Sequence, residues 1–484
     1  MDRRSTKQKA NGLHRQREKK LAGGDERPEP AVGVEAIPDA VLADIFELLP
    51  FEERRDTVPL VCKWWSRLTV SEPHIWKHCR WDGQERREDD DNSGEMSGTI
   101  DWPRVVEWFI ARAEGVQTLQ VSNFEFRFSP EVPTFSVLLA LLCPSLRELR
   151  LVRCKMGRDS WMGLLCLQGL RRLDLLLNDR LMSWRSISHL SRLTNLDALH
   201  IEYVNRTFEY ESDIPGPITV PFAQKLTTLR LKNFGDLKAI VPSWCFEKWR
   251  GMEMLDLCGT EVMSLTESIS VLTNLAELHV WTQSKLPTEI SRLTNLRMLS
   301  TRDTPSLGAL CGMSRLRELE FNLNRAFESV EDLQVMSGLA MLTSLKFKWP
   351  GGYFPQELTG LSALRYLDLS DDSLSDLPSG PYLDNLTELD LSWNGFSQVP
   401  GVLWRASNLV RLSLAYNDEL ELGELAVDAI LEMEDLLFLD IRFLEDKQWT
   451  QASFRNLVRL MEEKNDWLIV SADRTESIDE DEDF

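Results

Sequence analysis

Apolar residues recur in one short pattern along about three-quarters of this chain. Copies of LxxLxL, in which x is any residue, begin weakly at Val116 and become clear at Leu146. The starts of neighbouring copies differ by 22 residues between Leu364 and Leu386. Apolar residues that alternate in this way indicate short strands, each buried on one face. The other clear copies begin at Leu170, Leu196, Leu226, Met252, Leu275, Leu296, Leu316, Leu342, Leu409 and Leu436.

The repeat resembles the leucine-rich repeat family, whose units are roughly 20 to 29 residues long. The resemblance implies an α/β solenoid with a concave parallel sheet and with turns or helices on the outer side. Asn178, Asn394 and Asn417 stand where a side-chain amide can satisfy backbone groups of the turn between repeats. Cys154 takes the same place in its own repeat.

We expect the solenoid to occupy residues 100–470. The segment 101–113 has the spacing of an amphipathic helix and is expected to cap the first repeat. Residues 433–470 are expected to close the other end.

A second pattern, with helical spacing, precedes the repeats. Pro38 suits the first turn of a helix, and apolar residues then recur at helical spacing up to Pro50. A second helix is expected from about Glu52 to Leu68, with an irregularity at Pro59. So short a segment buries little surface alone, so its exposed apolar side chains are expected to meet a partner.

This helical segment resembles the F-box family. The matching features are the pairs Ile37-Pro38, Ile45-Phe46 and Leu49-Pro50, the run Leu60-Val61-Cys62-Lys63 followed by Trp65, and Glu72-Pro73 before Trp76. Trp64 and Ala40 depart from the family's pattern. The resemblance implies a three-helix F-box over residues 35–81 that docks onto the Skp-type adaptor of cullin-based ubiquitin ligases.

The same resemblance implies which residues bind the adaptor, although several of them, especially Trp65 and Trp76, are equally suited to holding the helices together. The implied adaptor-binding residues are Ile37, Pro38, Leu42, Ile45, Phe46, Leu49, Pro50, Val61, Cys62, Trp65 and Trp76.

Charge separates three further segments. The formal net charge is −22, which argues against general binding to nucleic acid or anionic membranes, because both need a cationic face. Residues 1–34 are basic and nearly free of apolar residues, and their two basic groups fit a bipartite nuclear import signal or a solvated tail. Residues 82–99 are expected to form an acidic linker, and residues 471–484 an acidic disordered tail.

The expected location is the cytoplasm, the nucleus or both. The sequence has no run of about 18 apolar residues, and its N-terminus lacks an apolar secretory core. The eight cysteines are scattered and are expected to be reduced thiols.

No catalytic motif points to an enzyme. The sequence has no GxxxxGK[ST], GxSxG or HExxH pattern, and no cofactor is expected. His74, His78 and Cys79 lie around Trp76 in the helical segment and are not expected to bind a metal. The chain is therefore expected to be a non-catalytic substrate receptor, with the adaptor and cullin on the F-box and the protein to be ubiquitinated on the repeats.

Two alternatives remain open at this point. One is a receptor whose substrate pocket is completed by a small ligand, and the other is a protein-interaction scaffold without ubiquitin transfer.

Solvent-facing positions of the repeat strands supply the candidate substrate surface. An aromatic side chain between cations could anchor an acidic or phosphorylated peptide. Glu202, Glu277 and Glu318 lie nearby and reduce the positive field. The candidate substrate-binding residues are His200, Arg230, Lys232, His279, Trp281, Arg302, Lys346 and Lys348.

Overall fold

The chain forms two compact units in a computed structural model, Met1–Val204 and Asn205–Phe484. The described residues are 37–82, 102–126, 135–156, 158–178, 189–203, 218–219, 225–232, 238–240, 243–262, 265–282, 286–302, 307–322, 330–348, 351–442, 450–464 and 469–471. The expected basic tail at 1–34 lies outside these residues, as do the expected linker at 82–99 and the expected acidic tail at 471–484 except for their first residues, Asp82 and Ser471, each of which ends a strand.

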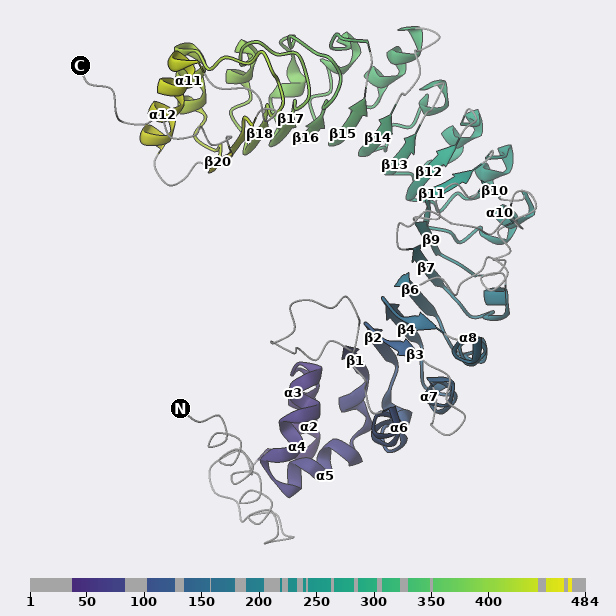
Figure 1. Cartoon of the computed structure of the whole chain (residues 1–484). Helices are drawn as coiled ribbons and strands as arrows, with labels where there is room; N and C mark the ends of the chain where they lie inside the picture. Colours follow the sequence, from purple (N-terminus) through teal and green to yellow (C-terminus); the bar gives the residue numbers. More distant parts are fainter. Residues whose placement is uncertain are drawn as a thin grey trace, which may run out of the picture. The chain divides into compact units, whose positions relative to one another are not determined.

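The first unit begins with a helical module over residues 37–76 (Figure 1). Pro38 and Pro50 precede its first two helices with φ of −57° and −52°, values that suit a helix start without needing an N–H group. The helices of the module are α2 (Asp39–Glu47), α3 (Phe51–Asp56), α4 (Val58–Val61), α5 (Lys63–Ser71) and the 3₁₀-helix η2 (Pro73–Trp76).

The expected single helix from Glu52 to Leu68 is wrong, because this segment divides into α3, α4 and α5. Cys62 interrupts the helical path with an extended backbone, at φ −159° and ψ 167°. Its Sγ accepts a hydrogen bond from the backbone N–H of Trp65 at 3.4 Å and thereby caps α5. The irregularity expected at Pro59 instead falls on either side of it, since Pro59 lies within α4.

An aromatic core joins the helical module to the first repeat. The Trp76 ring lies edge-on to Trp108 of α6 (Trp102–Ile110), with centroids 4.7 Å apart. The Phe51 ring also packs on the Trp76 indole, with the two ring centroids 6.2 Å apart. Buried Arg54 of α3 donates hydrogen bonds to the backbone oxygens of Ile75 in η2 and of His78 in the strand that follows. These charge-assisted hydrogen bonds connect α3 to the end of the module.

A parallel sheet follows in the same unit. Its neighbours run in the order β1 (His78–Asp82), β2 (Thr118–Ser122), β4 (Glu148–Val152), β6 (Arg172–Asn178) and β7 (Ala198–Tyr203). The boundary expected at residue 81 falls inside β1, so the chain that leaves the helical module already belongs to the repeat sheet. A separate parallel pair consists of β3 (Glu125–Phe126) and β5 (Lys155–Met156).

Helices cover one side of this sheet (Figure 1). The segment expected to cap the first repeat forms α6, and its buried side chains include Val105, Val106 and Phe109. The remaining helices are η3 (Ala113–Gly115), α7 (Phe135–Leu142), α8 (Arg158–Leu164) and η4 (His189–Arg192).

The second unit continues the same architecture. From β11 onward, each strand pairs in parallel with the next strand along the chain. The first part of β11 also pairs with β9, and its last part pairs with β10, which in turn pairs with β8. The strands are β8 (Ile218–Thr219), β9 (Thr228–Lys232), β10 (Lys238–Ile240), β11 (Met254–Val262), β12 (Glu277–Thr282), β13 (Met298–Arg302), β14 (Glu318–Asn322), β15 (Ser344–Lys348), β16 (Tyr366–Asp368), β17 (Glu388–Asp390), β18 (Arg411–Ser413), β19 (Phe438–Asp440) and β20 (Ile469–Ser471).

Most return segments of this unit are short 3₁₀-helices on the side opposite the strands (Figure 1). They are η5 (Glu267–Val271), η6 (Thr288–Arg292), η7 (Leu307–Leu310), η8 (Val330–Gly338), η9 (Gln356–Leu358), η10 (Pro381–Leu383) and η11 (Gly401–Arg405), together with α10 (Ser243–Lys248), α11 (Glu424–Glu432) and α12 (Gln451–Lys464). In the segment expected to close the array, α12 is followed by β20, and β20 pairs with β19.

The strands coincide with the LxxLxL copies, and their apolar side chains form the core. Leu364, Leu367 and Leu369 of one copy are fully buried, and the same holds for the equivalent leucines of neighbouring copies. At roughly 25 cal/mol per Å² of buried apolar surface, this stacking is the main stabilising term, and each repeat depends on its neighbours for it.

Two asparagine series satisfy backbone groups that the repeats would otherwise bury unpaired. Asn417, fully buried, accepts from Phe396 N–H at 3.0 Å and donates to the carbonyls of Leu391 and Leu414. Asn394 does the same one repeat earlier, as expected. The Asn178 side chain lies outside the described residues. On the return side, Asn195, Asn274, Asn295, Asn385 and Asn408 each donate to a carbonyl of the preceding repeat.

Among the helices of the described residues, none combines the length and the apolar character needed to cross a bilayer.

Candidate protein-docking surfaces

Helix α2 carries apolar side chains on two sides. Leu42, Ala43 and Phe46 face the core of the module and are buried. Val41, Ile45 and Leu48, which we call the α2 stripe, are spaced by four and three residues and are exposed, Ile45 by 41% and Leu48 by 85%. Side chains at this spacing lie along one face of a helix. The α2 stripe therefore presents aliphatic surface that the fold of the module does not use.

Further aliphatic residues of the module are also exposed. Leu60 and Val61 lie on α4, and Val70 lies on α5. Val41, Leu48, Leu60 and Val70 are absent from the adaptor-binding residues that the family resemblance implies. Their signal in the sequence is weak, because an apolar residue in an amphipathic helix normally indicates the buried face.

Three residues predicted to bind the adaptor instead build the core of the module. Leu42, Phe46 and Trp76 are at most 2% exposed. Phe46 packs edge-on to Trp65 with centroids 4.8 Å apart, and the Trp76 Nε1–H donates to the Thr69 carbonyl. A side chain enclosed in this way cannot contact a partner in this conformation, so we assign these three residues to the core.

The other predicted adaptor-binding residues reach the surface to different degrees. Pro38, Pro50 and Val61 are exposed, as is Ile45 of the α2 stripe. Ile37, Leu49, Cys62 and Trp65 are partly exposed. Their role in binding remains a prediction.

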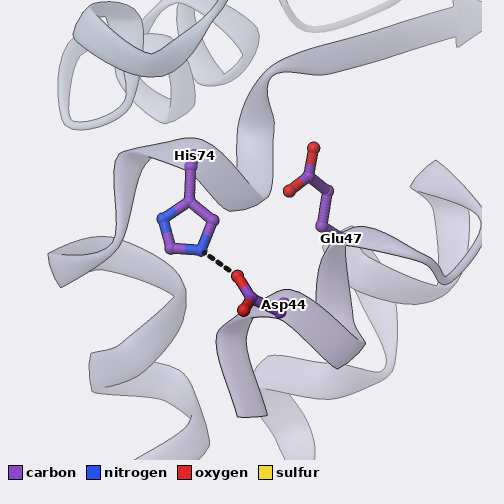
Figure 2. Close-up of side chains that lie close together, drawn as sticks. All are labelled: Asp44, Glu47 and His74. Atoms are coloured by element: carbon purple, nitrogen blue, oxygen red, sulfur yellow. Dashed lines mark ion pairs between the residues drawn. The ribbon is translucent and has the colours of Figure 1, made fainter. Parts of the chain in front are cut away.

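One polar group at the module surface combines side chains from two elements. His74 of η2 lies beside Asp44 of α2, with Nε2 and Oδ1 3.3 Å apart, and Glu47 stands on the next turn of α2 (Figure 2). Glu72 approaches the other imidazole nitrogen at 3.7 Å. Asp44, Glu47 and His74 could each offer one ligand atom to a cation, but the contacts of the imidazole with Asp44 and Glu72 account for the same arrangement. We therefore interpret the group as a tie between α2 and η2.

The predicted substrate-binding cations lie on strand positions, and carboxylates accompany most of them. In the second unit, Lys232 Nζ lies 3.3 Å from buried Asp256, and Lys346 lies 3.8 Å from Glu320 and 3.6 Å from Asp368. Lys348 pairs with Asp371 at 3.0 Å. Positive and negative side chains thus alternate between neighbouring strands, and this face is not uniformly cationic.

The other predicted substrate-binding residues differ in their contacts and exposure. The Arg230 Nε–H points at the thioether of Met254, 2.8 Å away. His279 and Trp281 of β12 are partly exposed, and the Arg302 side chain lies outside the described residues. In the first unit, His200 Nε2 lies 3.9 Å from Glu202. Substrate binding by these residues remains a prediction.

Several carboxylates of the strand column have a structural role. Asp368, Asp390 and Asp440 accept a hydrogen bond from the backbone N–H two residues later, which fixes the turn that leaves each strand. Burial of such a carboxylate is tolerated because its charge is hydrogen-bonded. These aspartates therefore carry less information on binding than their position suggests.

Comparison with known proteins finds partial likenesses only. No family model matches the chain. A segment of 140 residues, 27% of this chain, is 35% identical to TMV resistance protein N of Nicotiana glutinosa but spans only 12% of that protein.

Two solved structures resemble most of the chain. An internalin of Listeria monocytogenes is 21% identical and aligns over 69% of this chain and 89% of its own, with a TM-score of 0.47. A leucine-rich repeat protein of Leptospira interrogans is 18% identical and aligns over 74% and 90%, with a TM-score of 0.49. Both scores are low, so the assignment rests on the strand register and the buried leucines of this chain. These define a leucine-rich repeat protein with an α/β solenoid-like fold.

Proposed function

We propose that the chain is the substrate-recognition subunit of a cullin-based ubiquitin ligase, with the helical module docking a Skp-type adaptor and the repeats binding the protein to be ubiquitinated. The observation that carries this proposal is the α2 stripe. Aliphatic side chains such as Leu48 gain roughly 1.5 to 3 kcal/mol on full burial, so an exposed row of them favours association with a partner.

The likeness of the segment 37–76 to the F-box family supplies the kind of partner. Pro38, Ile45 and Val61 belong both to the matched pattern and to the exposed surface. The packing of Trp76 on Trp108 supports a further point, that the adaptor-bound module and the first repeat move together.

The receptor would carry out no bond chemistry of its own. A protein held on the repeats would be brought close to the activated ubiquitin, which raises the effective concentration of its lysines.

Charge substitution in the α2 stripe tests the proposal. We expect Ile45→Asp with Leu48→Asp to weaken binding of a purified Skp-type adaptor by at least about tenfold. The reason is that two carboxylates would take the place of two aliphatic side chains that the complex would bury. Titration calorimetry with the full chain is the measurement. Leu425→Asp is the matched control, since Leu425 on α11 is 86% exposed but lies outside the module.

Unchanged adaptor binding by a folded double variant would remove the assignment. The scaffold alternative would then remain, because it shares the repeat surface but needs no adaptor. A receptor completed by a small ligand differs in that its substrate would bind only when the ligand is added.

A further inference from the structure

Two aromatic side chains stack where the chain leaves neighbouring strands of the second unit. Trp393 and Tyr416 each follow the last residue of their strand, Asp390 of β17 and Ser413 of β18, by three positions. Their ring centroids are 4.4 Å apart, and the ring planes differ by 27°. We call this pair the aromatic stack.

The turn itself does not require aromatic residues. Trp393 and Tyr416 have φ of 57° and 59°, in the left-handed region that bulky residues rarely adopt and that Asn, Asp and Gly tolerate best. Asp371, at the equivalent position one repeat earlier, has φ of 63° and is an ordinary occupant. The backbone shape is held instead by the amides of half-buried Asn394 and buried Asn417, which donate to carbonyls just before Trp393 and Tyr416.

The packing of the repeats does not require the Trp393 indole either. Trp393 is 49% exposed, whereas the apolar residues beside it in the chain, such as Leu391 and Phe396, are fully buried. The only ring that it contacts in the described part of the chain is that of Tyr416. A large aromatic side chain that is neither buried nor needed by the turn is available to a partner.

Carboxylates lie on the strands and turns next to the aromatic stack in the sequence and in the sheet. Asp371 is exposed, and its described ion pair is with Lys348 of β15. Exposed Glu388 and half-buried Asp390 lie on β17 itself. The pKa of Tyr366, on the adjacent β16, is raised to about 12, first by burial and then by Asp368, Asp390 and Glu388.

Lysines of β15 already pair with two of the nearby carboxylates, Lys348 with Asp371 at 3.0 Å and Lys346 with Asp368 at 3.6 Å, whereas the nearest described arginines have other partners. Arg442 lies 5.8 Å from the Tyr416 ring, but its guanidinium is held by both carboxylate oxygens of Asp440, at 2.9 and 2.6 Å. Arg411 lies over the Phe438 ring instead, 4.8 Å from its centroid. The exposed indole, with exposed Glu388 and half-buried Asp390 of β17, thus offers a surface that favours positive charge.

We propose that the aromatic stack, with Asp371 and Asp390, binds an arginine- or lysine-bearing segment of a partner protein. A cationic side chain gains from the indole face and from the carboxylates together, and a guanidinium can do both at once. The inference rests on the proposal that the repeats bind a protein, but it is independent of the adaptor. The basic partner segment proposed here has the opposite charge to the acidic or phosphorylated peptide that the sequence suggested for the candidate substrate-binding residues.

Peptide binding to the full chain tests this surface. The probe is a fluorescein-labelled hexa-arginine peptide, measured by anisotropy at about 0.15 M salt so that weak long-range attraction is screened. We expect Trp393→Ala to lower affinity by roughly five- to tenfold, within the range of a partly desolvated cation–π contact. Trp393→Phe keeps an aromatic face and should retain most of the affinity.

Matched controls separate this site from the overall negative charge. Trp404→Ala removes another indole, 62% exposed on η11, and should leave affinity unchanged. Asp371→Asn should weaken binding by about two- to fivefold, whereas Asp435→Asn, an exposed carboxylate on a return turn, should not.

Three results would overturn the inference. They are equal binding by Trp393→Ala and wild type, preference for a hexa-glutamate peptide, and hexa-arginine binding that appears only after residues 1–34 are removed. The last result would make the basic N-terminal segment the occupant. Adaptor binding measured on the same variants should not change, so failure here leaves the proposed function standing.

Discussion

The helical module and the repeat strands expose their side chains in opposite ways. On α2, Ile45 and Leu48 present aliphatic surface beside a core that is already complete. On the strands of the second unit, Lys232 and Lys346 reach solvent but pair with carboxylates of neighbouring repeats. Unpaired apolar surface favours a stable partner, whereas paired charges are largely satisfied within the chain. The difference shows that surface position alone does not identify a docking residue.

The largest expected effect concerns the core that joins the module to the first repeat. Trp76→Ala should lower the free energy of unfolding by about 3 to 5 kcal/mol, because the buried indole packs on Phe51 and Trp108. Thermal unfolding of the full chain is the measurement. Trp404→Ala, at an exposed tryptophan, should change stability by less than about 0.5 kcal/mol. Similar losses in both variants would contradict the assignment of Trp76 to the core.

A smaller effect is expected from the asparagines of the repeats. Asn417→Ala should cost about 1 to 3 kcal/mol, because the buried Phe396 N–H and Leu414 carbonyl lose the hydrogen bonds that the Asn417 amide makes to them. Asn408→Ala on the exposed return side should cost about 1 kcal/mol or less. Denaturant unfolding compares the two, and an equal cost would mean that burial does not distinguish the two asparagine series.

Charge removal on the strand face should have less effect still. Lys346→Met breaks contacts with Glu320 and Asp368 but keeps the apolar stem, so the change in stability should be within about 1 kcal/mol. Raising the salt concentration should shrink the difference between variant and wild type. A loss of several kcal/mol that is insensitive to salt would show that the pair is structural rather than a screened surface contact.

The smallest effect is chemical rather than structural. Burial raises the pKa of the Cys154 thiol from 9.0 to about 12, so this group favours the folded state fully below pH 9 and loses that contribution as pH rises toward 12. At pH 8, iodoacetamide should modify exposed Cys166 and Cys311 and spare Cys154 and Cys79. Peptide mass spectrometry reads the sites, and equal labelling of all four would indicate that the first repeats open readily.

Periodicity in the sequence predicted the repeat strands and both closing segments. It succeeded because each inward leucine must be buried by its neighbours, which leaves a strict pattern. The same reasoning placed the break in the helical module wrongly, because the interruption at Cys62 depends on a single extended residue rather than on a composition signal.

The surfaces were harder to predict. Leu48 has the residue type of a core position but is exposed, and Phe46 matches the docking pattern but is buried. The aromatic stack left only the WN and YN dipeptides as a trace in the sequence. Its stacking, its left-handed backbone and its acidic surroundings depend on the register of three repeats.

Hydrogen–deuterium exchange of the full chain, with and without a purified Skp-type adaptor, tests the central claim most directly. We predict that the adaptor slows exchange in α2 and in the segment from α4 to α5, around the exposed Ile45, Leu48 and Val61. The strands β9–β19 should exchange as they do in the free chain. Protection confined to the repeats, or no protection at adaptor concentrations that saturate a known F-box protein, would contradict the account.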